Sequence, residues 1–223
     1  TYYGAKTTSI ETRSPVFVRV KAETLAEMIT NASKVYIMSH KDMDSDSFGS
    51  CLAACKLASA LNKKAKIIFD PDSIDETIAN IYKIIQQEYV TILDYLLHPR
   101  EALNKIDDDT LLIIVDTQYQ HLLTSEKLFK KAKKIAVIDH HRRNNDAIKN
   151  YQFLYTQSSA SSTVELIVEM FQFLDVDIDI TPIEATWMLM GVIVDTNNLM
   201  YRVSYRTFNV LSVLQKYGAE MPK

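Results

Sequence analysis

The stretch Ser39-His40-Lys41-Asp42-Met43-Asp44-Ser45-Asp46 joins two segments of different character. The apolar run before it, at 35–38, predicts a short buried strand. The segment after it, at 50–58, has the composition of a helix. One imidazole and three carboxylates therefore follow a strand directly, which is where open α/β sheets carry their functional groups. Because crowded carboxylates repel one another, the stretch predicts a bound divalent metal ion.

Strand and helix patterns alternate along the rest of the chain. Apolar runs predict further strands at 65–69, 110–115, 134–138 and 151–155. Helical patterns lie at 23–29, 74–87, 123–131, from Ser161, from Pro182 and at 206–217. Residues 88–105 fit a short strand followed by a helix that begins near Pro99. This alternation predicts an α/β fold, a mostly parallel sheet with helices on both faces.

The composition narrows the class of protein. The 223 residues carry a formal net charge of −3, so no duplex nucleic acid or other polyanion is expected as a partner. The lysine-rich segments at 63–66 and 130–134 are typical of solvated helix ends and loops. No apolar run approaches the ~20 residues that a membrane helix needs. Cys51 and Cys55 lie one helical turn apart and predict buried thiols in an intracellular protein.

Three predicted strands end in aspartate or histidine. These residues are His40, Asp44 and Asp46, then Asp116, then Asp139, His140 and His141. The ends of parallel strands share one edge of a sheet, so these groups should converge, and Asp195 after an apolar helix can reach the same edge. Taken alone, Asp116 or Asp195 has an alternative role as a turn or helix cap. Taken together, the set is sufficient for two metal ions that polarise a phosphoryl group, and its chemistry suits manganese.

In this order the motifs resemble those of the DHH phosphoesterase superfamily, over about residues 16–220. The segments at 137–143, 160–166 and 191–196 are similar to the cyclic-di-AMP phosphodiesterases of GdpP type. Residues 2–11 are similar to the segment that joins the degenerate GGDEF domain of those enzymes to their DHH domain. The chain departs from the pattern at Met43, where many members have proline.

The resemblance implies two Mn²⁺ ions and assigns their ligands. One ion would be bound by His40, Asp44 and Asp116. The other would share Asp116 as a bridge and add Asp46, His140 and Asp195.

The resemblance also implies the catalytic and substrate-binding residues. His141 would face the substrate phosphate, and Asp139 would orient His140 from behind. Four further side chains have the chemistry to bind phosphate, namely Arg142, Arg143, Ser161 and Ser162.

The activity implied by the resemblance is hydrolysis of cyclic-di-AMP to the linear dinucleotide by a metal-activated hydroxide, so cyclic-di-AMP or a short linear dinucleotide is the expected ligand. A short-oligonucleotide exonuclease and a manganese pyrophosphatase are alternatives from the same superfamily. A catalytically silent module for nucleotide binding or dimerisation is a third alternative. The presence of all the expected metal ligands favours an enzyme.

The resemblance further implies how the chain is divided. Residues 1–15 are expected to be a linker from an upstream domain, and residues 16–220 a DHH phosphoesterase domain. Because the chain begins at Thr1 and stops soon after a helix-end signal at 217–219, we expect it to be cut from a longer protein. The C-terminal DHH-associated domain, with its substrate motif, is expected to be absent from this chain. For the full-length protein, the resemblance implies a homodimer anchored in the membrane by upstream segments, with this part in the cytoplasm.

Overall fold

The computed structural model describes residues 14–221. At its centre is a six-stranded parallel sheet with the strand order β3-β2-β1-β4-β5-β6. The strands are β1 (Val35–Met38), β2 (Ala65–Ile68), β3 (Leu96–Leu97), β4 (Leu111–Val115), β5 (Lys134–Asp139) and β6 (Phe153–Thr156). The predicted α/β fold is therefore confirmed. The expected linker at 1–15 lies outside the described residues except for Ser14 and Pro15, and Pro15 already begins the first helix.

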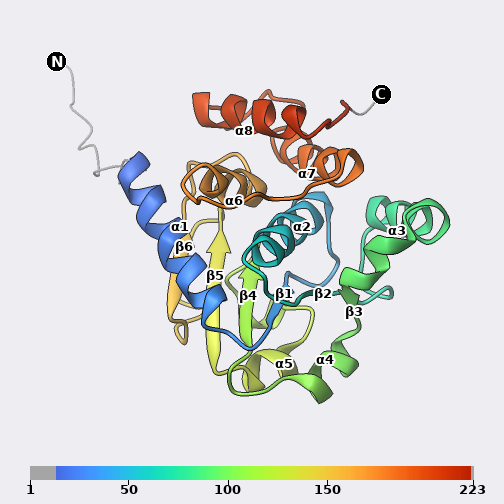
Figure 1. Ribbon diagram of the computed structural model, residues 1–223, viewed down its shortest axis with the longest axis vertical. Helices are drawn as coiled ribbons and strands as arrows, with labels where there is room; N and C mark the ends of the chain where they lie inside the picture. Colours follow the sequence, from blue (N-terminus) through green and yellow to red (C-terminus); the bar gives the residue numbers. More distant parts are fainter. Residues whose placement is uncertain (1–13, 222–223) are drawn as a thin grey trace.

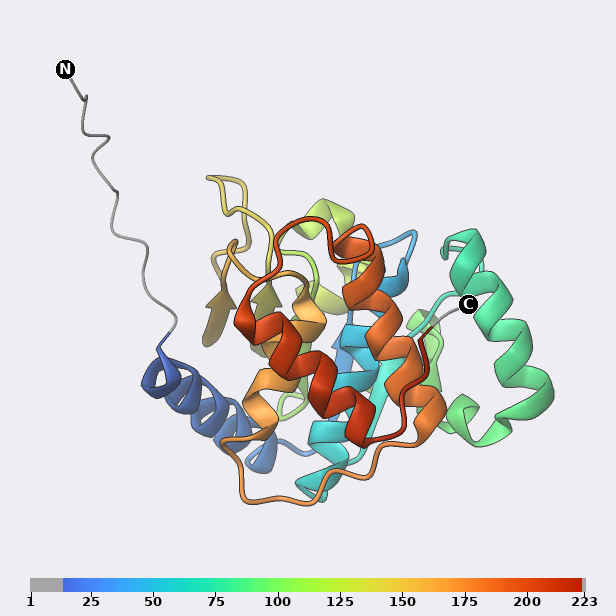
Figure 2. The ribbon, with the colours of Figure 1, turned by 90° about the horizontal axis from the view of Figure 1, so that it is seen from above.

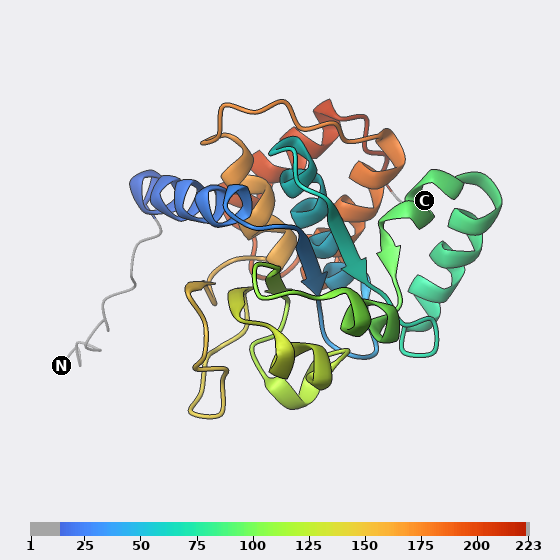
Figure 3. The ribbon, with the colours of Figure 1, turned by 60° about the horizontal axis from the view of Figure 1, so that its bottom comes forward.

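Helices cover both faces of the sheet (Figure 1). One face carries α1 (Pro15–Thr30), α2 (Ser45–Ala60), α3 (Glu76–Glu88), α6 (Thr163–Phe171), α7 (Pro182–Asp195) and α8 (Tyr205–Lys216). The opposite face carries α4 (Pro99–Lys105) and α5 (Glu126–Lys131), which come forward in Figure 3. The short 3₁₀ helices η1 (Val90–Tyr95) and η2 (Gln120–Leu122) lie in connecting segments.

Alternate residues along each strand pack into two hydrophobic cores, one on each face of the sheet. Ile37 and Ile113 belong to the larger core, whereas their neighbours Tyr36 and Leu112 belong to the smaller one. This is why the central strands β1 and β4 are apolar along their whole length. On the larger side, α7 and α8 form an outer layer above α2 and α6 (Figure 1), and the view from above shows α8 crossing over α6 (Figure 2).

The order of the strands determines where functional groups meet. The chain runs outward from β1 to β2 and β3 and then returns to β4 on the other side of β1. The loops that leave β1 and β4 therefore diverge, which opens the crevice where such sheets bind ligands. Met38 pairs with Ile114, and Val115 pairs with Ile138. His40, Asp116 and Asp139 consequently leave their strands at the same level.

The helix after the opening stretch begins earlier than the sequence predicts. It starts at Ser45 instead of near Ser50, with the Asp44 side chain accepting a hydrogen bond from the Ser47 amide as the cap. Asp46 thus lies in the first helical turn and not in a loop. Serine and glycine in this turn weaken the helical pattern, but complete burial of the turn stabilises it.

Other expectations are confirmed. Cys51 and Cys55 are buried free thiols inside α2. Ser125 caps α5, and Gly218 ends α8 with a left-handed φ of 87°. Among residues 14–221, no helix combines the length and the apolar character needed to cross a membrane.

Candidate metal centre

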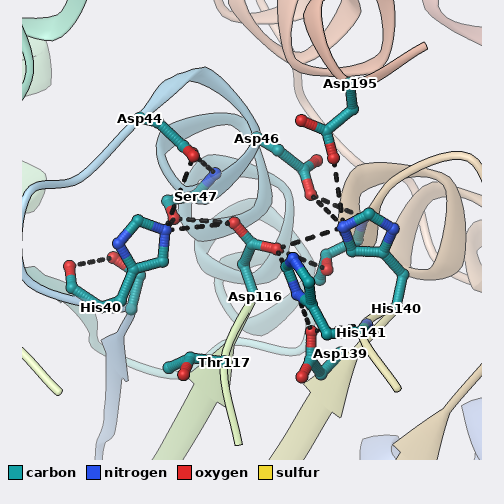
Figure 4. A network of polar contacts seen from close by, with 12 residues as sticks. His40, Asp44, Asp46, Ser47, Asp116, Thr117, Asp139, His140, His141 and Asp195 are labelled. Atoms are coloured by element: carbon teal, nitrogen blue, oxygen red, sulfur yellow. Dashed lines mark hydrogen bonds and ion pairs between the residues drawn. The ribbon is translucent and has the colours of Figure 1, made fainter. Parts of the chain in front are cut away.

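The aspartates and histidines at the ends of β1, β4 and β5 converge, and Asp195 joins them from the end of α7 (Figure 4). Two groups, in which the candidate ligand atoms lie within 4.8 Å of one another, are made of predicted metal ligands alone: His40, Asp44 and Asp116, and then Asp46, His140 and Asp195. A third group of this kind joins Asp116 and His140 to His141. Asp116 lies between the groups. Its Oδ2 is 3.5 Å from His40 Nε2, and its Oδ1 is 3.6 Å from His140 Nε2. This geometry fits two cations that share one carboxylate.

The backbone at Asp116 has an unusual conformation. Its φ of 59° lies in the left-handed region, which aspartate tolerates better than most residues. The carboxylate is buried and accepts hydrogen bonds from Ser47 Oγ at 2.8 Å and Thr163 Oγ1 at 3.1 Å. Backbone strain of this kind is concentrated at functional sites, where surrounding contacts hold it in place.

The backbone also fixes the orientation of His40. Its Nδ1 lies 2.7 Å from the carbonyl oxygen of Lys41, which only accepts, so Nδ1 carries a proton. Nε2 consequently points into the first group, 2.6 Å from Ser47 Oγ and 3.7 Å from Asp44 Oδ2. An imidazole whose outer N–H is held by a carbonyl is the usual arrangement of a metal ligand. Burial opposes the charged ring, but hydrogen bonds to Asp116 and Asp44 raise the pKa of His40 to about 11.

His140 is the second buried imidazole. Its Nε2 lies 3.1 Å from Asp195 Oδ2 and 3.7 Å from Asp46 Oδ2. Within the described part of the chain, neither ring nitrogen makes a well-directed hydrogen bond, although buried polar atoms almost always have one. Burial opposes protonation, but the carboxylates of Asp195, Asp46 and Asp116 raise the pKa of His140 to about 9. A buried imidazole with unsatisfied nitrogens beside three carboxylates fits a cation.

Asp46 is held by the start of another helix. Its two carboxylate oxygens accept hydrogen bonds from the amides of Thr163 at 2.8 Å and Val164 at 3.1 Å, the first two residues of α6. Burial, with the nearby charges of Asp116 and Asp195, raises the pKa of Asp46 well above its ordinary value. A cation would relieve this concentration of negative charge.

Asp195 reaches the centre because α7 passes unusually close to α2. A Cβ atom added at Gly191 would lie 2.9 Å from the carbonyl oxygen of Ser45 and 3.0 Å from the Cα of Asp46. Only glycine permits this approach of one backbone to another.

Asp139 contacts His141, so the predicted pairing of Asp139 with His140 is wrong. Asp139 Oδ1 accepts hydrogen bonds from the His141 amide at 3.1 Å and from His141 Nδ1 at 2.8 Å. Residues two apart at an extended strand end point to the same side, which places His141 and not His140 beside Asp139. The hydrogen bond to Asp139 raises the pKa of His141. The His141 side chain is 51% exposed, and its Nδ1 lies 3.7 Å from Asp116 Oδ1.

The four candidate phosphate ligands lie in different surroundings. Arg142 is exposed and borders a cavity beside the first group. Arg143 donates to Gln118 Oε1 and to the carbonyl of Ile148, so its guanidinium holds the loop after β5. Ser161 and Ser162 are fully buried, and their hydroxyls bond to Glu165. A role for these residues in binding substrate stays a prediction.

The centre also contains two hydroxyl groups that the sequence analysis did not identify. Ser47 and Thr163 both donate to Asp116, from the first turns of α2 and α6. Asp44 caps α2, and Ser47 lies three residues later in the first helical turn. This short spacing from a predicted metal ligand was a signal that Ser47 could face the site. Thr163 had none, because its contact with Asp116 spans 47 positions of the sequence.

The cavity beside the first group has a volume of about 410 Å³. The side chains of His40, Asp44, Asp116 and His141 border it on the metal side. The rest of its wall comes from the loop after β4, from Asp139 and from Arg142. The cavity is therefore large enough for part of a nucleotide and lies directly against the candidate ligands.

Residues 34–192 match the family model described as DHH family, N-terminal domain. The cyclic-di-AMP phosphodiesterase GdpP of Bacillus subtilis is 39% identical over 219 residues, which make up 98% of this chain and 33% of that protein. The cyclic-di-AMP phosphodiesterase PdeA of Listeria monocytogenes is 33% identical with the same coverage of both chains. This chain thus spans about a third of the length of these relatives. An exopolyphosphatase-related protein from Bacteroides fragilis has the same fold, with a TM-score of 0.72, 20% identity, and coverage of 91% of this chain and 58% of that one.

Proposed function

The chain belongs to the DHH family, and we propose that residues 16–220 form a metal-dependent phosphodiesterase domain that hydrolyses cyclic-di-AMP to the linear dinucleotide. The observation that carries the proposal is the pair of ligand groups with the Asp116 carboxylate between them. The choice of substrate is supported by two relatives named as cyclic-di-AMP phosphodiesterases, each of which matches 98% of this chain.

Two manganese ions fit the donor set of imidazoles and carboxylates. In this assignment the first is held by His40, Asp44 and Asp116, and the second by Asp46, Asp116, His140 and Asp195. When bound, such a pair of cations polarises the phosphoryl group and makes water a better nucleophile near neutral pH.

In this proposal His141 supplies a proton. Its Nδ1–H donates to Asp139, so Nε2 is the nitrogen left for the substrate, and the hydrogen bond to Asp139 raises the pKa of His141, which favours the protonated ring. Nε2–H can then donate to a phosphoryl oxygen or to the leaving oxygen as charge develops there. Arg142, at the cavity wall, offers a fixed positive charge to a second phosphate.

The test is to follow cyclic-di-AMP, a 5′-phosphorylated diadenylate, a short RNA and pyrophosphate by chromatography with added manganese. We expect cyclic-di-AMP to give the linear dinucleotide, and we expect Asp116→Asn to abolish the reaction because the Asp116 carboxylate lies between both ligand groups. Faster cleavage of the short RNA or of pyrophosphate would favour the exonuclease or the pyrophosphatase instead. No cleavage of any of them by the metal-loaded protein would favour the silent binding module.

A further inference from the structure

Tyr119 borders the cavity beside the metal centre and has no part in the proposed chemistry. It lies three residues after Asp116, in the loop that leaves β4, and its side chain is partly exposed. Leu122 from the same loop borders the cavity with it. The remaining side chains of the wall are charged or polar, so Tyr119 and Leu122 provide its main apolar surface.

Tyr119 is held in place through both its side chain and its backbone. Its hydroxyl donates a hydrogen bond of 2.9 Å to the carbonyl oxygen of Arg142, and its amide donates to Thr117 Oγ1 at 3.3 Å. The neighbouring Gln118 side chain donates to the carbonyl oxygen of His141 at 3.0 Å. The loop after β4 is thereby tied to the loop that carries His141, and the ring has a fixed position relative to the reacting groups.

A nucleotide has a charged part, its phosphates, and a flat aromatic part, its base, and these bind to different kinds of side chain. Its phosphates suit the cations, His141 and Arg142, but its base needs an apolar face on which to stack. A fixed aromatic ring provides such a face with little loss of conformational entropy. We propose that Tyr119, supported by Leu122, is the stacking surface for one base of the substrate. This inference rests on the proposed function for the identity of the substrate, and it places base recognition inside this chain.

The rival explanation is structural, because the Tyr119 hydroxyl also fixes the Arg142 backbone. Tyr119→Phe removes that hydrogen bond and keeps the ring, whereas Tyr119→Leu removes both. Tyr205→Ala is the matched control, since Tyr205 is 66% exposed at the start of α8 and does not border the cavity. Circular dichroism checks that each variant is folded.

The ligands are AMP and ribose 5-phosphate, which differ only in the base, and their binding is measured by calorimetry with magnesium present. Stacking on an aromatic side chain is worth about 1–3 kcal/mol per base, which corresponds to roughly 5- to 150-fold in affinity. We expect Tyr119→Leu to weaken AMP binding by a factor in this range and to leave ribose 5-phosphate unchanged. We expect Tyr119→Phe and Tyr205→Ala to bind AMP as the wild type does. In the wild type, NMR should show magnetisation transfer between the base protons and the Tyr119 ring.

Three outcomes would overturn the inference: equal affinity of the wild type for AMP and ribose 5-phosphate, equal weakening by Tyr119→Phe and Tyr119→Leu, or no magnetisation transfer to Tyr119. Failure of the proposed function gives a different pattern. If no phosphodiester is cleaved but AMP still binds through Tyr119, the enzymatic proposal fails and the stacking surface stands.

Discussion

Gly191 sets the distance between α7 and α2, and replacing it with alanine tests how the metal centre is assembled. The new Cβ would lie 2.9 Å from the Ser45 carbonyl oxygen and 3.0 Å from the Asp46 Cα. Carbon atoms in contact are normally about 3.5–4.0 Å apart, so α7 must retreat by about 0.5–1 Å. Asp195 lies four residues later on the same helical face and moves with it.

The two expected effects differ in size. Overpacking costs about 1–3 kcal/mol, of which alanine's better helix propensity returns up to about 1 kcal/mol, so Tm should fall by no more than roughly 10 °C. Metal sites tolerate only about 0.2 Å of error in ligand distance, so the retreat of Asp195 should weaken the group of Asp46, His140 and Asp195 by about 10-fold or more. The group of His40, Asp44 and Asp116 should keep its affinity.

Manganese titration by calorimetry and thermal unfolding measure both effects on the same samples. Val210→Ala in α8 is the control, because it removes buried volume and adds no atom between α7 and α2. We expect the control to lose stability and to bind manganese normally. A folded Gly191→Ala protein that binds two ions with wild-type affinity would refute the reasoning, as would an equal loss of affinity in the control.

Three other predictions concern the histidines and Asp139. His140→Ala should lose metal, whereas His141→Ala should keep it and lose turnover by about 10²-fold or more, as elemental analysis and kcat would show; loss of metal in His141→Ala would contradict this assignment. Asp139→Asn should lower kcat by about 10- to 100-fold with metal content unchanged, because it weakens the hold on His141 Nδ1, and an unchanged kcat would exclude this role. In the metal-free protein His40 and His140 have pKa values of about 11 and about 9, so both carry an extra proton at neutral pH that a metal must displace. Manganese affinity should therefore weaken as the pH falls from about 9 to about 7, with proton release seen by calorimetry in buffers of different ionisation enthalpy; an affinity independent of pH would argue against imidazole ligands.

The convergence of the site could be predicted from the sequence because the topology of a parallel sheet determines where the strand ends lie. His40, Asp116 and Asp139 each follow an apolar strand, and parallel strands bring such positions to one edge. The pairing of Asp139 was mistaken although the alternation of side chains along a strand already favoured His141.

The parts that could not be predicted depend on contacts between distant segments. Ser47 and Thr163 approach Asp116 only once α2 and α6 are packed side by side on the sheet. The cavity wall at Tyr119 depends on the path of the loop through η2, which no periodic pattern describes. The closeness of α7 to α2 at Gly191 likewise appears only in the folded chain.

The capping of α6 by a residue of another helix makes the centre observable from a distance. Asp46 offers its oxygens to the amides of Thr163 and Val164, and an ion that binds Asp46 draws on the same lone pairs. Filling the second position should therefore shift the NMR signals of these two amides and change their rate of hydrogen exchange, with no substrate present. With a diamagnetic ion such as magnesium or zinc, the start of α6 becomes a gauge of metal occupancy, and the order in which the two positions fill can be followed residue by residue.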